Sequence, residues 1–209
     1  MRILLVDDHP IVRHGIRSLL SERIAGSTII DAADGDTALT LLAQAPWDIV
    51  LLDLTLRGRS GLDVLKELRH RQLGVPVLVL SIHPVNQFAL RALNAGAQGY
   101  VSKDSSPDEL VDAIDTVRRG RRYVTPEARE LVVGWAQQEE KAPHERLSDR
   151  EYQVLRMIGS GQTVSDIAKA FRISVKTVST YRSRVLEKLG MQSNAELMRY
   201  AIENHLLDS

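Results

Sequence analysis

The stretch ILLVDDHPIVRHGIRSLL, residues 3–20, sets a pattern that the first half of the chain repeats. A run of four apolar residues is followed by Asp7 and Asp8, and Pro10 then begins a segment with apolar side chains at helical spacing. Pro suits the first turn of a helix because its missing N–H would be unpaired there anyway. The stretch therefore predicts a strand, an acidic turn and a helix. Two adjacent carboxylates repel each other and are costly to bury, so they need a partner.

Similar apolar runs recur along the first 120 residues, and amphipathic segments separate them. Several runs are apolar without alternation, which is typical of strands buried on both faces of a parallel sheet. The intervening segments carry apolar residues on one helical face. The sequence therefore predicts a doubly wound α/β fold with a five-stranded parallel sheet. The predicted strands are residues 3–6, 28–33, 49–52, 77–80 and 99–101.

The remainder of the chain shows only helical patterns. We interpret residues 121–145 as a linker with one helix that starts at Thr125-Pro126. Beyond it, residues 146–209 form a smaller all-α domain, in which Ser148 and Glu151 have the spacing of a capping box. This gives two domains, with residues 1–120 as the first. The predicted helices of the second domain are residues 148–159, 164–171, 175–189 and 194–205.

Composition narrows the class of protein. The chain has 209 residues, 44% of them hydrophobic and 26% charged, and no cysteine, which excludes disulfides and thiolate metal sites. No apolar run approaches the roughly 18 residues of a membrane span, and no signal peptide is evident, so we expect a cytoplasmic protein without a membrane partner. The formal charge is −2 in residues 1–120 and +3 in residues 146–209. Any polyanionic partner is therefore expected at the C-terminal domain.

Chemically active side chains follow four of the five predicted strands. Asp7 and Asp8 follow the first, Asp53 the third, Ser81 the fourth and Lys103 the fifth. In an open parallel sheet, ligands bind at the carboxyl ends of the strands. Carboxylates at this edge suit Mg²⁺, which prefers oxygen ligands, and the lysine and hydroxyl suit phosphoryl oxygens. One carboxylate could then act as the nucleophile toward phosphorus.

A simpler interpretation exists for each of these residues. A lone Asp after a strand is most often a turn former or a helix cap, and Ser81 could merely cap the helix that follows it. The coincidence of all these positions at one edge favours the phosphoryl site. The six histidines show no paired spacing that would build a metal site, so surface or capping roles are expected for them.

Residues 1–120 resemble the receiver domain of response regulators, which has a flavodoxin-like fold, and residues 146–209 resemble a LuxR-type helix-turn-helix domain. Together they resemble the NarL/FixJ group of two-component transcription regulators. The resemblance implies that Asp53 is the phospho-acceptor and that Asp8 binds Mg²⁺ directly. It further implies that Asp7 acts through water and that the backbone carbonyl of Thr55 is the third protein ligand of the metal.

The same resemblance assigns the remaining receiver positions. Ser81 and Lys103 match the residues that contact the phosphoryl group, and Ser81 and Tyr100 match the switch pair, although an aromatic on the last strand is often only packing. Arg57 stands where the family often has Pro, and Ile82 stands where many receivers have a small residue. Both departures leave the mobility of the loop and the lifetime of the phosphoryl group open.

Residues 163–190 carry the second resemblance. The segment 175–189 separates an apolar arc from a polar, net basic arc, as a helix that enters the major groove requires. The apolar arc contains Val175, Val178, Tyr181, Val185, Leu186 and Leu189. The expected DNA-binding residues are Lys176, Thr177, Ser179, Thr180, Ser183, Arg184 and Lys188. Arg182 falls inside the apolar arc without explanation. On the last helix, Leu197, Ala201 and Ile202 match the surface through which such domains pair, or they belong to the core.

The resemblance implies a regulator of transcription rather than an enzyme. It would take a phosphoryl group from a sensor histidine kinase, bind double-stranded DNA, and form a homodimer when phosphorylated or DNA-bound. One alternative is a phosphorylation-independent DNA-binding regulator that uses the receiver for dimerisation. Another is a phosphatase or hydrolase on a similar sheet. Such enzymes place a second acid two residues after the nucleophile. This chain has Thr55 at that position, which argues against a hydrolase.

Overall fold

The structure is a computed structural model that describes residues 1–56, 58–81, 87–125 and 142–207. The chain divides into two compact units with the boundary after Gln137. We describe each unit by itself. The helix expected from Thr125-Pro126 onward, Arg57 and Ile82 lie outside the described residues. No helix among the described residues combines the length and apolarity needed to cross a membrane.

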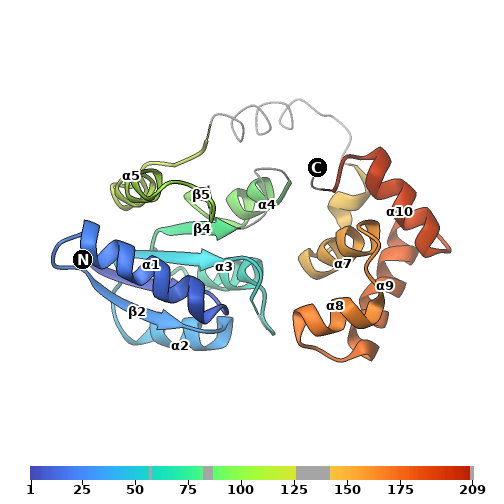
Figure 1. Ribbon diagram of the computed structural model, residues 1–209, viewed down its shortest axis with the longest axis horizontal. Coiled ribbons are helices and arrows are strands. Elements are labelled where there is room, and N and C mark those ends of the chain that lie inside the picture. The colour runs from blue at the N-terminus through green and yellow to red at the C-terminus, as the bar shows by residue number, and fades with distance from the viewer. Residues whose placement is uncertain (57, 82–86, 126–141, 208–209) are drawn as a thin grey trace. The chain divides into compact units, whose positions relative to one another are not determined.

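The first unit contains a five-stranded parallel sheet, as the sequence predicts (Figure 1). The strand order is β2-β1-β3-β4-β5, which is a doubly wound topology. Helices alternate with the strands along the chain. The strands are β1 (Arg2–Val6), β2 (Thr28–Ala32), β3 (Ile49–Asp53), β4 (Val77–Ser81) and β5 (Gly99–Ser102). The helices are α1 (Pro10–Arg23), α2 (Gly35–Gln44), α3 (Gly61–His70), α4 (Gln87–Ala95) and α5 (Pro107–Arg118).

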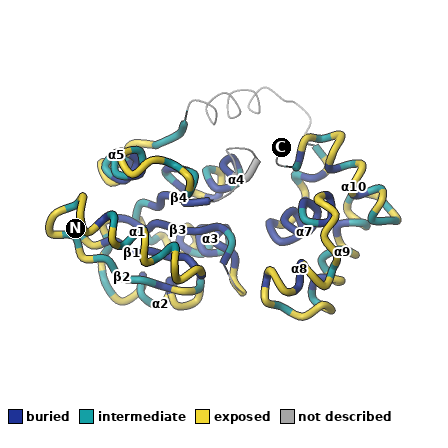
Figure 2. Tube along the Cα trace, in the orientation of Figure 1, coloured by how far each residue is buried: buried dark blue, intermediate teal, exposed yellow. Residues whose placement is uncertain are grey.

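The centre of this sheet is buried on both faces. Every residue of β3 and β4 is buried, and β1 is exposed only at Arg2, whereas the edge strand β2 is partly accessible (Figure 2). The core on one face joins the strands to α1 and α5. The continuous apolar runs of the sequence correspond to this two-sided burial.

The turn from β3 into α3 requires a glycine. The N–H of Gly61 donates to the carbonyl of Leu54 at 3.1 Å, and a Cβ atom on Gly61 would lie 2.2 Å from the carbonyl oxygen of Asp53. Ser60 caps α3, because its hydroxyl accepts from the N–H of Asp63 at 3.1 Å and the Asp63 carboxylate reaches back in a capping box. This close approach fixes the backbone at the carboxyl end of β3.

The second unit is all helical. It comprises the short 3₁₀ helix η1 (Pro143–Arg146), α7 (Asp149–Gly159), α8 (Val164–Phe171), α9 (Val175–Leu189) and α10 (Asn194–Glu203). The four α-helices are those that the sequence predicts, although α10 ends two residues earlier, and η1 is not predicted. The capping box of Ser148 and Glu151 is present. The buried side chains at the centre of this unit include Tyr152, Leu155, Ile167, Phe171, Val178, Val185, Leu197 and Ala201.

Candidate functional site

The predicted carboxylates and the predicted lysine meet at the carboxyl edge of the sheet. Asp7 and Asp8 follow β1, and Asp53 ends the neighbouring strand β3. Their exposed fractions are 1%, 8% and 2%. Lys103, just after β5, places its Nζ 2.6 Å from Asp7 Oδ2 and 2.8 Å from Asp53 Oδ2. One ammonium therefore bridges two buried carboxylates from different strands.

The electrostatics of this cluster follow from its burial. Burial raises the pKa of Asp53, and the charge of Asp7 adds to the rise, while Lys103 opposes it. Burial is thus a larger cause of the raised pKa than repulsion from the neighbouring carboxylate. Burial lowers the pKa of Lys103, but attraction to Asp53 and Asp7 outweighs this and raises its pKa overall. Lys103 is therefore charged over the physiological range.

The donor atoms of this edge suit a divalent cation. Ligand atoms of Asp7, Asp8, His9 and Asp53 all lie within 4.8 Å of one another. Asp53 Oδ1 accepts the backbone N–H of Thr55 at 3.1 Å, which holds the start of the β3–α3 loop beside the carboxylate. Three carboxylates in so small a volume fit Mg²⁺, because the cation offsets their mutual repulsion and accepts oxygen ligands.

The structure buries Ser81 on β4, the strand next to that of Asp53, and Tyr100 on β5, the strand beyond it. Ser81 ends β4, and its carbonyl accepts the backbone N–H of Lys103 at 2.8 Å. Tyr100 lies on β5 opposite Val79, and both Ser81 and Tyr100 have no exposed surface. The backbone thus joins the end of β4 to the residue that carries the bridging ammonium.

In the second unit, α9 presents a polar face to solvent. Ser174 caps the helix and accepts the N–H of Thr177 at 3.0 Å, and Val178 and Val185 are buried against the neighbouring helices. Thr177 is partly exposed. The other side chains predicted to contact DNA are all exposed. They are Lys176, Ser179, Thr180, Ser183, Arg184 and Lys188.

Both units match known families. Residues 3–115 match the response regulator receiver domain, and residues 145–201 match the bacterial regulatory proteins of the luxR family. Response regulator UvrY of Escherichia coli K12 is 34% identical over 212 residues, covering 100% of this chain and 97% of UvrY. Response regulator GacA of Pseudomonas aeruginosa is 35% identical over 212 residues, covering 100% and 99%. The chain belongs to the LuxR-type response regulators.

Solved structures of response regulators share this architecture. A LuxR-family response regulator from Aurantimonas sp. SI85-9A1 is 40% identical with a TM-score of 0.60, covering 66% of this chain and 98% of that one. RcsB of Salmonella enterica serovar Typhimurium, bound to a promoter in the presence of the phosphomimetic BeF₃⁻, is 26% identical with a TM-score of 0.59. That match covers 96% of this response regulator and 97% of RcsB.

The structure corrects one prediction about α9 and narrows another about α10. Val175, predicted on the apolar arc of α9, is 49% exposed because it lies at the open first turn of the helix. On α10, burial shows which of the three residues belong to the core. Leu197 and Ala201 have no exposed surface and belong to the core, whereas Ile202 is 60% exposed and faces solvent.

Lys188 has a partner within its own unit. Its Nζ lies 2.6 Å from Glu151 Oε2, and the Glu151 side chain is buried. The contact of Lys188 with DNA phosphate stays a prediction, but the structure gives this residue a second role in joining α9 to α7. Arg182 is also explained, because its Nε donates to Asn194 Oδ1 at the start of α10.

Two histidines make specific contacts that the sequence does not predict. His144 is buried, and its Nδ1 lies 2.8 Å from the hydroxyl of Tyr200 on α10, which contradicts the expected surface or capping role. His9 is the N-cap residue of α1, but its side chain makes no capping hydrogen bond. Instead, its Nδ1 lies 3.0 Å from Asp8 Oδ1 and 3.2 Å from Asp7 Oδ1. Tertiary packing brings His144 to Tyr200, 56 positions along the chain, whereas His9 contacts its own sequence neighbours.

Arg13 was also missed. Its Nη1 donates to the carbonyl of Asp7 at 2.5 Å, and its Nε lies 4.0 Å from the Asp31 carboxylate on β2. A guanidinium is well suited to hold two acceptors in fixed directions. Arg13 lies in the first turn of α1 and therefore holds the peptide bond between Asp7 and Asp8 in place.

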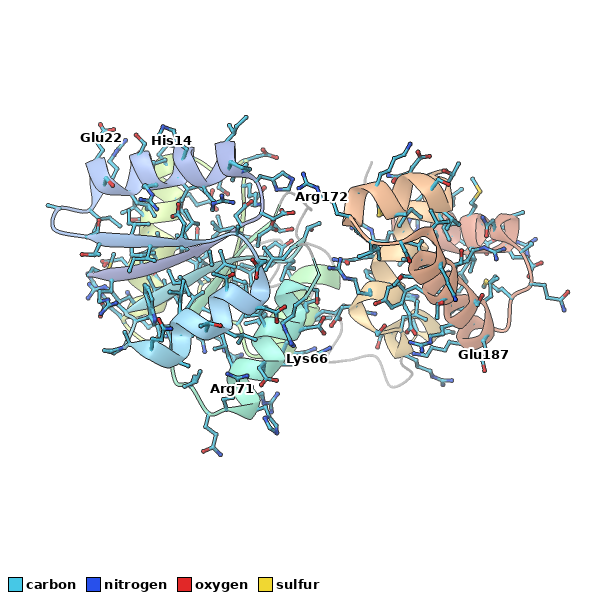
Figure 3. The ribbon with its side chains drawn as sticks, turned by 90° about the horizontal axis from the view of Figure 1, so that it is seen from below. His14, Glu22, Lys66, Arg71, Arg172 and Glu187 are labelled. Atoms are coloured by element: carbon cyan, nitrogen blue, oxygen red, sulfur yellow. The ribbon has the colours of Figure 1, made fainter. Side chains whose placement is uncertain are left out.

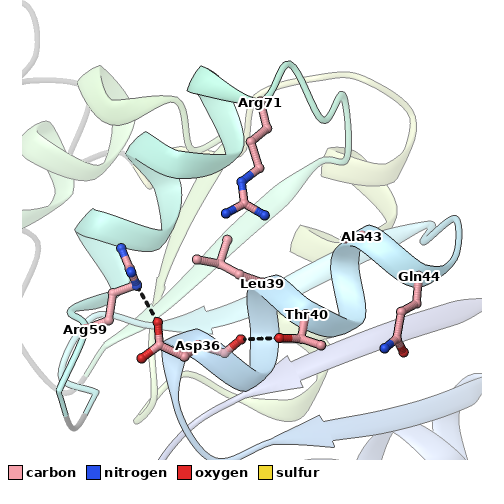
Figure 4. A pocket seen from close by; sticks show the side chains of 7 residues that line it. All are labelled: Asp36, Leu39, Thr40, Ala43, Gln44, Arg59 and Arg71. Carbon is pink, nitrogen blue, oxygen red and sulfur yellow. Dashed lines mark hydrogen bonds and ion pairs between the residues drawn. The ribbon is translucent and has the colours of Figure 1, made fainter.

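A pocket of about 380 Å³ lies between α2 and α3, and none of its lining residues belongs to the carboxylate cluster (Figure 4). Arg59 in its wall pairs with Asp36 at 2.7 Å, and Arg71 pairs with Glu67 at 2.7 Å. Both guanidiniums thus have intramolecular carboxylate partners. The pocket therefore offers no uncompensated charge to a ligand.

Proposed function

We propose that this response regulator accepts a phosphoryl group on Asp53 from a sensor histidine kinase and controls transcription by sequence-specific binding of double-stranded DNA. The observation that carries the proposal is the Lys103 ammonium, which bridges Asp7 and Asp53 at the carboxyl edge of the sheet. A buried ammonium beside a buried carboxylate is what transfer of a phosphoryl group to that carboxylate requires, because negative charge accumulates there.

In the proposed reaction, an Asp53 carboxylate oxygen forms a bond to phosphorus. The bond from phosphorus to the imidazole nitrogen of the kinase breaks, and the nitrogen keeps the electron pair. Lys103 and the hydroxyl of Ser81 bind the transferred oxygens. Bound Mg²⁺ would neutralise charge on the phosphoryl oxygens. Its proposed protein ligands are Asp8, Asp53 and the Thr55 carbonyl, with Asp7 acting through water.

For DNA binding, we propose that α9 enters the major groove. Support comes from the exposed hydroxyl and basic side chains on one face of α9 and from the net charge of +3 in residues 146–209. RcsB, whose solved structure is bound to promoter DNA, is similar to 96% of the length of this chain. We propose that Ser179, Thr180 and Ser183 face base edges, and that Lys176, Thr177 and Lys188 lie near phosphates. Arg184 is also proposed to contact DNA.

We propose that Ser81 and Tyr100 form the switch that reports phosphorylation and that the phosphorylated or DNA-bound protein is a homodimer. Structures of RcsB include two dimers on two DNAs, which supports the dimer. The proposed domains are residues 1–120, a linker of residues 121–145 and residues 146–209, acting in the cytoplasm. A phosphorylation-independent regulator that uses the receiver for dimerisation is the competing function.

The test is phosphorylation by a small-molecule donor with Mg²⁺, followed by DNA selection from genomic fragments. Wild type is compared with Asp53→Asn and with Asp104→Asn, an exposed acid beside Lys103. We expect an acid-labile phosphoprotein in wild type and Asp104→Asn only, with tighter DNA binding after phosphorylation. Absence of phosphoprotein with every donor would refute the phospho-acceptor. Equal DNA binding by phosphorylated and Asp53→Asn protein would favour the competing function. Steady phosphoester turnover would indicate a hydrolase.

A further inference from the structure

His9 brings a nitrogen donor to an edge that is otherwise lined by oxygen donors. Its Nδ1 lies 3.0 Å from Asp8 Oδ1 and 3.2 Å from Asp7 Oδ1. The side chain does not cap α1, although His9 occupies the N-cap position. The imidazole is therefore directed back to the two acids, while more than half of its own surface, 57%, remains exposed.

The carboxylates divide between two cationic or basic neighbours. Asp7 Oδ2 and Asp53 Oδ2 face the Lys103 ammonium at 2.6 and 2.8 Å. Asp7 Oδ1 and Asp8 Oδ1 face the imidazole of His9. The backbone N–H of His9 also donates to Asp7 Oδ1 at 2.7 Å, which fixes the turn that carries all three side chains. On one side of the cluster, a single ammonium pairs with two carboxylates. On the other side, an imidazole nitrogen and two carboxylate oxygens form a mixed donor set.

The spacing of the mixed donor set matches the ligand spacing around a metal ion. Ligand atoms at about 2.1 Å from a six-coordinate ion lie about 3.0 Å from one another. The Nδ1 to Oδ1 separations of 3.0 and 3.2 Å are close to this value. The imidazole is the part of this donor set that solvent reaches most readily.

We infer that His9 makes this cluster a binding site for borderline divalent transition ions, which the imidazole and the Asp8 carboxylate bind together. Imidazole suits Zn²⁺, Ni²⁺ and Cu²⁺, whereas Mg²⁺ requires oxygen ligands and gains little from a nitrogen donor. His9 therefore raises affinity for transition ions selectively. The inference uses the same carboxylates as the proposed function and rests on their being available to a cation.

The test measures Zn²⁺ and Mg²⁺ affinities by calorimetry on the full chain, with His9→Ala as the variant. His14→Ala is the matched control, because His14 is an exposed histidine on the same helix (Figure 3). We expect His9→Ala to weaken Zn²⁺ binding by about tenfold or more and to change Mg²⁺ binding less than about twofold. His14→Ala should change neither affinity. Equal weakening of both metals in His9→Ala, or no weakening of Zn²⁺, would overturn the inference.

A spectroscopic measurement identifies the donor directly. Mn²⁺ serves as the probe, and pulsed electron paramagnetic resonance detects the ¹⁴N coupling of a coordinated imidazole. Coupling in wild type and His14→Ala, and its loss in His9→Ala, supports the inference. Coupling that is absent in wild type, or that persists in His9→Ala, contradicts it.

The two proposals fail in distinguishable ways. Zn²⁺ binding that depends on His9, in a protein that Mg²⁺ and donors leave unphosphorylated, supports the His9 site and refutes the phospho-acceptor. If Mg²⁺ and a donor phosphorylate Asp53, but His9→Ala binds Zn²⁺ as tightly as wild type, the His9 site alone is refuted.

Discussion

Lys188 Nζ lies 2.6 Å from Glu151 Oε2, and this ion pair joins the last turn of α9 to the first turn of α7. The Glu151 side chain is 3% exposed, and it also accepts the backbone N–H of Ser148 at 2.7 Å. Lys188→Ala would leave a buried carboxylate without its cation. We expect the free energy of unfolding of the second unit to fall by about 1.5–3 kcal/mol, measured by urea denaturation.

Lys176→Ala is the control for this effect. Lys176 is exposed in the first turn of the same helix, so its removal should change the free energy of unfolding by less than about 0.5 kcal/mol. Both variants should reduce the dependence of DNA affinity on salt if both lysines meet phosphates. Equal stabilities of the two variants would show that the pair with Glu151 contributes nothing measurable.

Glu151 also predicts a dependence of stability on pH. Burial raises the pKa of Glu151, but hydrogen bonds from Lys188 and Ser148 outweigh burial and hold the pKa below its ordinary value of 4.5. A carboxyl group with a lowered pKa stabilises the fold fully above its unfolded pKa, and this contribution is lost as pH falls through the folded value. Denaturation series from neutral pH to about pH 3 should therefore show a steeper loss in wild type than in Glu151→Gln. Parallel curves would contradict this assignment.

The sequence was sufficient for the fold and for the position of the candidate site. Continuous apolar runs predict strands buried on both faces, and strands of a parallel sheet end at one edge. Asp7, Asp53 and Lys103 directly follow or end such runs, so their convergence could be expected without coordinates. The bridging geometry of the ammonium could not, because it depends on side-chain directions at three separate strands.

Contacts between helices were not predictable in the same way. A periodic pattern identifies an apolar face but not which part of it a neighbour covers, so Val175 is predicted on the apolar arc yet is half exposed. The pairs formed by Lys188 with Glu151 and by His144 with Tyr200 join residues 37 and 56 positions apart. Polar residues at such separations carry no periodic signal, and only packing of the helices brings them together.

Arg172 is expected to be a strained position. It ends α8 in the left-handed region, with φ of 53°, at the turn between α8 and α9 (Figure 3). A side chain makes this conformation unfavourable by roughly 1–2 kcal/mol, whereas glycine adopts it freely at some cost in unfolded-state entropy. Arg172→Gly should therefore raise the free energy of unfolding by about 0.5–1 kcal/mol.

Arg172→Ala separates the backbone effect from loss of the guanidinium, because alanine keeps the Cβ atom. We expect no comparable gain from alanine in the same urea denaturation experiment. A gain of equal size in both variants would assign the effect to the side chain instead of to the backbone.

Gly61 should be the least replaceable glycine at the candidate site. A Cβ atom at this position would lie 2.2 Å from the Asp53 carbonyl oxygen and 2.8 Å from Leu54 Cα, and neither backbone atom can yield without moving the end of β3. Gly61→Ala should lower the free energy of unfolding by more than about 2 kcal/mol and slow phosphorylation, because it displaces Asp53, the proposed phospho-acceptor.

Gly15→Ala is the matched control, and it should change the free energy of unfolding in the opposite direction. Gly15 lies inside α1, and a Cβ atom there would meet nothing within 4 Å. Alanine at an open helix position should raise the free energy of unfolding by about 0.5–1 kcal/mol without affecting phosphorylation. Thermal denaturation and donor-dependent phosphorylation of both variants provide the comparison. If Gly61→Ala kept both the stability and the phosphorylation rate of wild type, the β3–α3 turn would tolerate the backbone shift, and the prediction would be wrong.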